Sequence, residues 1–288
     1  MSESERRPCR CLNLFEERRI QLLDWLRQRW APAVDLRNVL GDNQWTHPHE
    51  HSTLEKGQMT EPKNPYPWNH WPQQSPINFV KAESHYVKFP KSFLTFDYRA
   101  APFTGRFEGE AKHKNFVLSK PHPGKNRPML KLGDVEAELV KIHLHTKSEH
   151  NWEGKDLDGE IHLIHKIVNP SAGSELIVVG VFFDQSAPAV ESDFFAMWSA
   201  NLGKRRSDKA AEDDISIDPR HLLPKSKDWY RYEGSLTSEP YSEIVSWLVL
   251  TDPVGVGSED FKTLKKNAHQ PERPVQPINR RLVIRNFS

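Results

Sequence analysis

Three histidines have the residue type and spacing of a metal site: His143, His145 and His162. His143 and His145 are separated by one residue in a segment typical of a strand, so their imidazoles project from the same face. His162 lies in the next such segment, and the residues between include the turn formers Gly154 and Gly159. Two strands joined by this turn would pair and bring the third imidazole beside the first two.

Three neutral imidazoles around a divalent ion, with a fourth position left to water, are typical of a catalytic zinc site. Closed structural zinc sites use four protein ligands, usually rich in cysteine, and this chain has only Cys9 and Cys11. The spacing alone leaves open that these are surface histidines, because the chain contains 14 of them. The surrounding residues favour the zinc site.

Short strand-like segments separated by turns dominate the chain from Tyr66 onward. The predicted strands alternate apolar and polar residues or form short apolar runs, and they are 93–98, 139–145, 160–168, 176–183, 244–250 and 282–287. Helices are predicted at 189–202 and near 258–264. Without a repeat or a β-α-β alternation, the sequence predicts a mainly β fold, with a large, mostly antiparallel sheet and short peripheral helices.

Residues 1–64 differ from the rest and are predicted to be an extension of a main domain at 65–288. Apolar residues recur at helical spacing over 12–30, which predicts one amphipathic helix. This helix could dock on the main domain, mediate self-association or touch a membrane surface. Docking is the commonest fate of such an apolar stripe, so we favour it.

A polar stretch at 41–64 is predicted to be a linker, and it holds His47, His49 and His51. Alternate histidines in an extended segment share one face and could chelate a metal. No closing ligand lies nearby, so we interpret them as solvated.

Composition and charge argue against several partners and locations. The 40 basic residues are balanced by 39 acidic ones, which gives no electrostatic reason to expect nucleic acid or an anionic membrane as a partner. No segment has the length of a membrane span, and the N-terminus lacks the apolar run of a signal peptide. Both cysteines lie near the N-terminus, so the main domain cannot hold a disulfide. We therefore expect a cytoplasmic protein.

Five short motifs follow one another along the chain. They are QSPIN at 74–78, HLH at 143–145, SEH at 148–150, EIHLIH at 160–165 and GSLT at 234–237. Together they closely resemble the motif series of the alpha-class carbonic anhydrases, and RPVQPINR at 273–280 resembles that family's C-terminal segment. The likeness covers roughly residues 65 to 288. It implies a twisted, largely antiparallel ten-stranded sheet with zinc at the base of a conical cleft.

The resemblance assigns His143, His145 and His162 as the zinc ligands of an enzyme that hydrates carbon dioxide reversibly to bicarbonate and a proton. Zinc lowers the pKa of a bound water to about 7, so a hydroxide is available to attack carbon dioxide. Thr237 matches the residue whose hydroxyl accepts a hydrogen bond from that hydroxide. Its own proton goes to Glu149, which fixes the direction of the hydroxyl.

Other residues match supporting positions of the family. Glu160 matches the carboxylate that accepts a hydrogen bond from the free ring nitrogen of His162, which fixes the ring and raises its basicity. His165 lies at odd spacing from His162, so it should point to the opposite face and be structural. His150 is also interpreted as structural.

Carbon dioxide is small and has no net dipole, so it needs an apolar wall. The residues that match this pocket, some of which also pack in the core, are Ile164, Val178, Leu236, Val245 and Trp247, with Ser238 beside them. His113 matches the position of the family's proton shuttle, and a histidine can relay a proton through water near neutral pH, so the resemblance implies that His113 is the shuttle. The alternative for His113 is a surface histidine.

Several positions depart from the family pattern, including Lys141, Thr146 and Glu239. Lys141 replaces a usual Gln that orients the first ligand, which would weaken the support of His143. Thr146 replaces a usual Trp, and Glu239 at the cleft could slow bicarbonate binding through charge repulsion. These changes concern rate and inhibitor affinity, while the core zinc chemistry stays intact.

The sequence allows two alternatives to a carbonic anhydrase. One is a catalytically weak or silent relative that acts as a binding module, and the other is a zinc esterase, which could be a side activity. Silent relatives typically lose a zinc ligand, whereas this chain has all three together with Glu149 and Thr237. These residues favour the enzyme.

Overall fold

The computed structural model of the chain describes residues 72–99, 101–109, 114–120, 127–170, 174–189, 193–201, 215–267 and 272–288. The predicted helix at 12–30, the linker at 41–64 with its three histidines, and the shuttle candidate His113 lie outside these residues. The division at residues 64 and 65 therefore stays a prediction.

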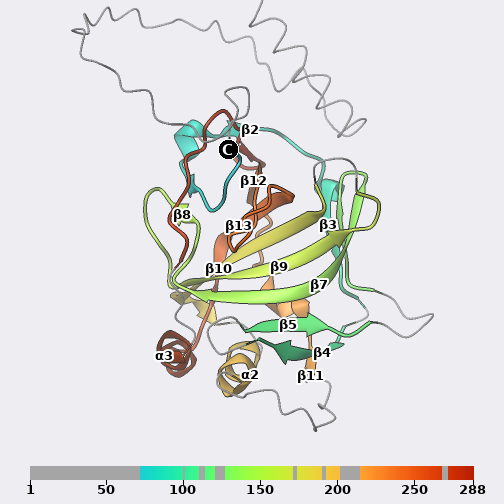
Figure 1. Ribbon diagram of the computed structural model, residues 1–288, viewed down its shortest axis with the longest axis vertical. Helices are drawn as coiled ribbons and strands as arrows, with labels where there is room; N and C mark the ends of the chain where they lie inside the picture. Colours follow the sequence, from blue (N-terminus) through green and yellow to red (C-terminus); the bar gives the residue numbers. More distant parts are fainter. Residues whose placement is uncertain are drawn as a thin grey trace, which may run out of the picture.

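A curved sheet of 12 strands dominates the described residues (Figure 1). Ten strands form one hydrogen-bonded path, in the order β11 (Ile215–Ile217), β4 (Phe103–Glu108), β5 (Asn115–Leu118), β7 (Val135–Thr146), β9 (Gly159–Ile167), β10 (Leu176–Ala189), β13 (Val245–Gly255), β12 (Trp229–Gly234), β14 (Ile284–Arg285) and β2 (His85–Tyr86). Beside this path, β3 (Leu94–Asp97) pairs with β6 (Met129–Leu132), and β6 also pairs with β7. A separate two-stranded sheet joins β1 (Asn78–Phe79) to β8 (Asn151–Trp152).

The predicted mainly β fold is confirmed, and most neighbouring strands are antiparallel. The exceptions are three parallel pairs, β10 with β13, β14 with β2, and β1 with β8. β10 and β13 are apolar on both faces in their central residues, as parallel strands covered on both sides usually are. The sheet exceeds the predicted ten strands because β3 and β6 pair beside the ten-strand path.

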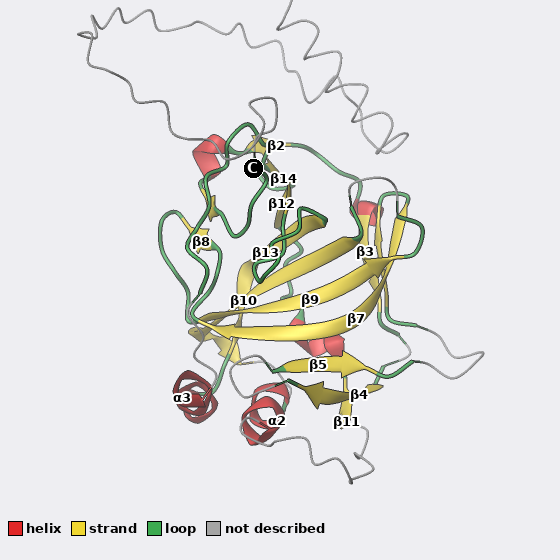
Figure 2. Cartoon of the chain, in the orientation of Figure 1, coloured by secondary structure: helices red, strands yellow, loops and turns green. Residues whose placement is uncertain are grey.

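Short helices lie at the periphery of the sheet (Figure 2). They are α2 (Phe194–Asn201), α3 (Ser258–Asn267) and the 3-10 helices η2 (Lys81–Glu83), η3 (Lys91–Phe93) and η5 (Pro219–Leu222). The predicted start of a helix at residue 189 was wrong, because β10 extends to Ala189. Helix α3 confirms the second predicted helix, and its acidic first turn and basic last turn complement the helix dipole.

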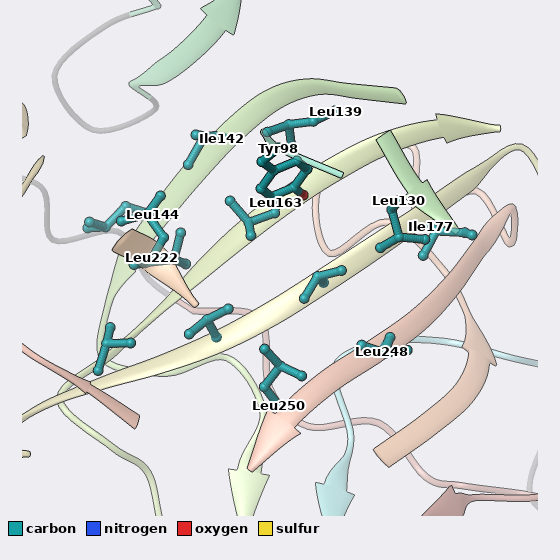
Figure 3. Packing of buried hydrophobic residues seen from close by; sticks show 14 of the residues in the cluster. Tyr98, Leu130, Leu139, Ile142, Leu144, Leu163, Ile177, Leu222, Leu248 and Leu250 are labelled. Atoms are coloured by element: carbon teal, nitrogen blue, oxygen red, sulfur yellow. The ribbon is translucent and has the colours of Figure 1, made fainter. Parts of the chain in front are cut away.

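The central strands bury different side chains on their two faces. On one face, apolar residues such as Ile142, Leu144 and Leu163 form a large core (Figure 3). Apolar residues of α2 and α3 belong to the same core. On the other face, residues such as Val178 and Trp247 form a smaller, aromatic-rich cluster. Side chains alternate along a strand, so the burial of the first face aims the intervening residues of β7 and β9 at the second.

No helix in the described part of the chain is long and apolar enough to cross a lipid bilayer.

Candidate metal centre

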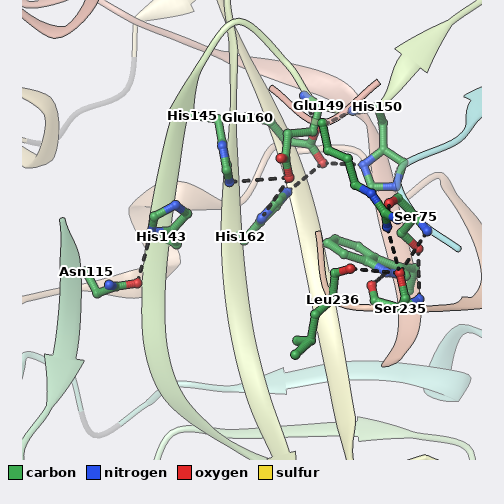
Figure 4. A network of polar contacts seen from close by, with 12 residues as sticks. Ser75, Asn115, His143, His145, Glu149, His150, Glu160, His162, Ser235 and Leu236 are labelled. Carbon is green, nitrogen blue, oxygen red and sulfur yellow. Dashed lines mark hydrogen bonds and ion pairs between the residues drawn. The ribbon is translucent and has the colours of Figure 1, made fainter. Parts of the chain in front are cut away.

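Strands β7 and β9 bring the three predicted ligands together on one face of the sheet. His143 pairs directly with His162 in the antiparallel register. The ring centroids of His143 and His145 are 4.5 Å apart, and those of His145 and His162 are 4.7 Å apart. Figure 4 shows the three rings turned toward a shared space. The alternation of the two strands therefore places the imidazoles as the sequence predicts.

Two groups of buried side chains in the described residues are close enough to hold a metal ion. In the first, the ligand atoms of His145, Glu149 and His162 lie within 4.8 Å of one another. His143 is outside this tight group, although its ring adjoins that of His145. Oε2 of Glu149 lies 3.4 Å from Nε2 of His145 and 3.9 Å from Nδ1 of His162, and it has no hydrogen-bond partner among the residues that the structure describes. A buried carboxylate oxygen facing imidazole nitrogens fits a divalent cation, and imidazole donors suit zinc.

A second group, His150, Glu160 and His162, is close enough for a metal but is occupied by hydrogen bonds. Oε1 of Glu160 is 2.8 Å from Nδ1 of His150 and 3.1 Å from Nε2 of His162. Its Oε2 accepts the backbone N–H groups of Glu149 and His150 at 3.1 and 2.9 Å. Glu160 therefore contacts Nε2 of His162, and Nδ1 of the same ring faces Oε2 of Glu149 in the first group.

Burial raises the pKa of Glu160, but the charges and hydrogen bonds of His150 and His162 outweigh it and hold the pKa well below its usual value. The carboxylate is therefore ionised. Gly180 of β10 makes room for it, since a Cβ at this position would lie 2.7 Å from Oε1 of Glu160. Glu160 thus lies within contact of His162, and His150 also contacts the hydroxyl of Tyr232 inside the fold, while the supporting roles of both residues stay predictions.

Asn115 of β5 is a site residue that the sequence did not reveal. Its Oδ1 lies 2.9 Å from Nδ1 of His143, and the two residues are paired across β5 and β7. Enclosure by the protein, followed by the neighbouring His145 and His162, lowers the pKa of His143 well below its usual value. His143 is therefore neutral near pH 7, as a metal ligand must be.

Glu149 and Thr237 meet at the site from different parts of the chain. Glu149 follows β7, and Thr237 follows β12 in the GSLT motif. Burial raises the pKa of Glu149, whereas His162 and a hydrogen bond with the Thr237 side chain lower it. The pairing of Thr237 with Glu149 is the one that the motifs predict.

A cleft of about 720 Å³ opens over these groups. An apolar wall crosses three strands, because Val178 of β10 pairs with Ile164 of β9 and with Trp247 of β13. Leu236 and Ser238 also line the cleft, as predicted. Val245 does not line it and is instead buried in the aromatic-rich cluster.

Charged residues also line the cleft, including Lys141, Glu239, Glu272 and Arg273. Sequence reasoning flagged the first two but missed Glu272 and Arg273, together with Tyr241 and Pro274. The likeness of 273–280 to a known C-terminal segment was the available signal. Thr146 lies at the end of β7, where it is buried and does not line the cleft.

Arg273 joins the C-terminal segment to the rim of the cleft. Its guanidinium donates to the backbone oxygen of Ser75 at 2.7 Å and to Oε1 of Gln74 at 2.8 Å. It also stacks 3.8 Å above the ring of Tyr241. Ser75 continues the network, since its Oγ accepts from the Tyr232 hydroxyl at 2.8 Å. The QSPIN motif therefore acts as a brace between the C-terminal segment and the site.

His165 points away from the metal centre, as its spacing predicts. It is fully buried in the large core, with Nε2 2.5 Å from the hydroxyl of Tyr98. Burial lowers the pKa of His165 to about 4 and raises that of Tyr98 well above its usual value. The phenol of Tyr98 therefore stays protonated and donates a hydrogen bond to Nε2 of the neutral imidazole.

Comparison with known proteins gives consistent results. The family model of eukaryotic-type carbonic anhydrases matches residues 58–287. A carbonic anhydrase of Nostoc sp. is 37% identical over 155 residues, which cover 54% of this chain and 56% of that protein. Alpha carbonic anhydrase 3 of Arabidopsis thaliana is 30% identical over 226 residues, 74% of each chain. The chain spans little more than half the length of several curated relatives, including 56% of a Klebsiella pneumoniae carbonic anhydrase.

A solved structure of similar fold is the alpha-carbonic anhydrase of Thermovibrio ammonificans in complex with the inhibitor sulfanilamide. It matches with a TM-score of 0.59 and 29% sequence identity, over 74% of this chain and 86% of the other.

Proposed function

The chain belongs to the eukaryotic-type carbonic anhydrase family, and from this membership we propose that it catalyses the zinc-dependent, reversible hydration of carbon dioxide to bicarbonate and a proton. The proposed zinc ligands are His143, His145 and His162. The observation that carries the proposal is the convergence of these imidazoles with Glu149 in one cleft that also has an apolar wall.

Zinc bound by three imidazoles would supply a Lewis acid that lowers the pKa of a water ligand to about 7. The chain's own contribution begins with the orientation of the rings. Glu160 lies 3.1 Å from Nε2 of His162, which leaves Nδ1 of that ring for the metal. Burial of the cleft floor strengthens each of these electrostatic interactions.

Thr237 and Glu149 are proposed to orient the attacking oxygen. Glu149 is buried and accepts the single proton of the Thr237 hydroxyl, so the Thr237 oxygen can only accept from the side of the cleft. This direction aims a lone pair of the attacking oxygen at the carbon of carbon dioxide. The fixed geometry requires no reorganisation during the reaction.

The wall formed by Ile164, Val178 and Trp247 is proposed to hold carbon dioxide, with Leu236 at its edge. An apolar surface suits a substrate without a net dipole. His113 as the proton shuttle, self-association through the helix at 12–30, and a cytoplasmic location stay predictions.

The test is stopped-flow hydration of carbon dioxide with metal analysis. We expect about one zinc per chain, with activity lost on chelation, restored by zinc and inhibited by sulfanilamide. His145→Ala should lose both zinc and activity. The matched control is His221→Ala, because His221 is partly exposed in η5 and does not line the cleft. Zinc without hydration activity would instead favour the silent binding module.

A further inference from the structure

Asn115 occupies a distinctive place beside the metal centre. It lies on β5, directly opposite His143 of β7 in an antiparallel pair, so the two side chains share one face of the sheet. Oδ1 of Asn115 is 2.9 Å from Nδ1 of His143, a normal hydrogen-bond distance (Figure 4). The amide also lines the cleft.

An amide oxygen can only accept a hydrogen bond, so the contact fixes the proton on Nδ1 of His143. Nε2 then keeps its lone pair. The backbone carbonyl of Lys114, the preceding residue, is a further hydrogen-bond partner of the His143 side chain. Asn115 of β5 therefore presents an acceptor to Nδ1 of His143 and selects one tautomer.

Lys141 cannot perform this task. It lies two residues before His143 on β7, where the side chain faces the same cleft, but an ammonium group has donors and no acceptor. Across the strand pair, Lys141 is matched with Val117, whose side chain has no acceptor either. The acceptor for His143 must come from β5, and Asn115 is the residue in register.

We propose that Asn115 is the positioning residue of His143, and that it selects the tautomer in which Nε2 faces the metal. This inference rests on the proposed zinc site. Partners of this kind typically change metal affinity by about 10- to 100-fold. Because the carbonyl of Lys114 remains, we expect an effect of about 10-fold when Asn115 is lost.

The test compares three variants of the full chain. Asn115→Leu removes the acceptor at similar size, and Asn115→Asp keeps an acceptor. The double variant Asn115→Leu with Lys141→Gln supplies an acceptor from the neighbouring position on β7. Zinc affinity is measured by competition with a fluorescent chelator. We expect about 10-fold weaker binding for the Leu variant, with affinity retained in the Asp variant and restored in the double variant.

A second measurement needs no metal. The ¹⁵N chemical shifts of the histidine rings in the zinc-free chain report which nitrogen carries the proton. We expect the proton of His143 on Nδ1 in the wild type, and a mixture of tautomers in Asn115→Leu. Thermal unfolding of each zinc-free variant separates this effect from a general loss of structure.

The inference is overturned if wild-type His143 carries its proton on Nε2. It is also overturned if Asn115→Leu binds zinc as tightly as the wild type, or if the Asp and Leu variants lose affinity equally. Failure of the proposed function looks different. Zinc binding without hydration activity would overturn that function and leave this inference standing, whereas a wild-type chain that binds no zinc would overturn both.

Discussion

At the residue scale, hydrogen bonds decide what each polar group in the cleft can do. Glu160 is ionised and surrounded by donors, whereas burial raises the pKa of Glu149, which meets the Thr237 side chain. Two buried carboxyl groups in one site thus have different electrostatic surroundings. The Thr237 hydroxyl and the Glu239 carboxylate at the rim can therefore be tested by separate substitutions.

Thr237→Val should lower kcat/KM for carbon dioxide hydration by about 100-fold, because the oriented hydroxyl is lost from a preorganised site. Thr237→Ser keeps the hydroxyl and should retain most of the activity. Zinc content should be unchanged in both, since Thr237 is not a proposed ligand. Stopped-flow kinetics with metal analysis checks this, and a Val variant with near wild-type rates would refute the orienting role.

Glu239→Gln should lower the KM for bicarbonate dehydration by about twofold at low ionic strength, because it removes a negative charge that faces the anionic substrate. The difference should shrink in high salt. Glu259→Gln is the matched control, because Glu259 is exposed on α3 and does not line the cleft. Equal effects of the two substitutions would show that the charge at the cleft has no specific role.

The sequence predicted the rings that converge but not every group that orients them. His-x-His alternation is a local pattern, and therefore it could be recognised in one strand. Asn115 and His143 are 28 residues apart, and only the register of β5 on β7 brings them together. Sequence reasoning expected Lys141 to leave His143 with weaker support and could not see the acceptor on the facing strand.

At the scale of elements, close packing between neighbouring strands sets the position of Glu160. Gly180 of β10 is paired with His162 of β9, and a Cβ there would also lie 3.1 Å from Val249 of β13. β10 thus approaches the Glu160 carboxylate at a point where no side chain would fit. The lack of a side chain at Gly180 therefore helps to keep Glu160 in contact with His162.

Gly180→Ala should destabilise the fold by about 1 to 3 kcal/mol, because the added methyl must displace Glu160 or Val249. It should also weaken zinc binding, since Glu160 contacts His162. Gly257→Ala is the control, because a Cβ there meets its nearest atom at 3.6 Å, an ordinary contact. Urea unfolding and chelator competition measure the two effects. Equal stability of both variants would contradict the packing argument.

The strands were easier to predict than their partners. Each long strand of the site was found from its apolar pattern, yet the parallel pairing of β10 with β13 was not. A strand buried on both faces has the same local pattern whichever direction its neighbour runs. The start of the helix predicted at 189–202 failed for a related reason, since pairing with β13 extends β10 to Ala189.

At the scale of the whole molecule, one face of the sheet holds the candidate metal centre and the other packs against the large core. His165 belongs to the second, where it is buried and neutral beside Tyr98. The pKa of His165 is about 4 in the fold, against an ordinary value of 6.5. Between these values the unfolded chain binds more protons than the folded chain, so acidification favours unfolding.

His165→Gln should therefore flatten the dependence of stability on pH between about 6.5 and 4, where His165 contributes a loss on the order of 3 kcal/mol. Glutamine keeps an acceptor for Tyr98 and does not titrate. Urea unfolding of the wild type and of the Gln variant across this pH range checks the prediction, and parallel curves for the two proteins would contradict it.

The hydrogen bonds of Arg273 with Ser75 and Gln74, here called the clasp, have a consequence for biosynthesis. Ser75 and Gln74 lie 198 and 199 residues before Arg273, so the clasp joins segments near the two ends of the described chain. A ribosome delivers Gln74 long before Arg273, and the clasp cannot form until the later residue has emerged from the exit tunnel. The nascent chain can pair β7 with β9 early, yet its cleft acquires the finished rim only after Arg273 has been added to the chain.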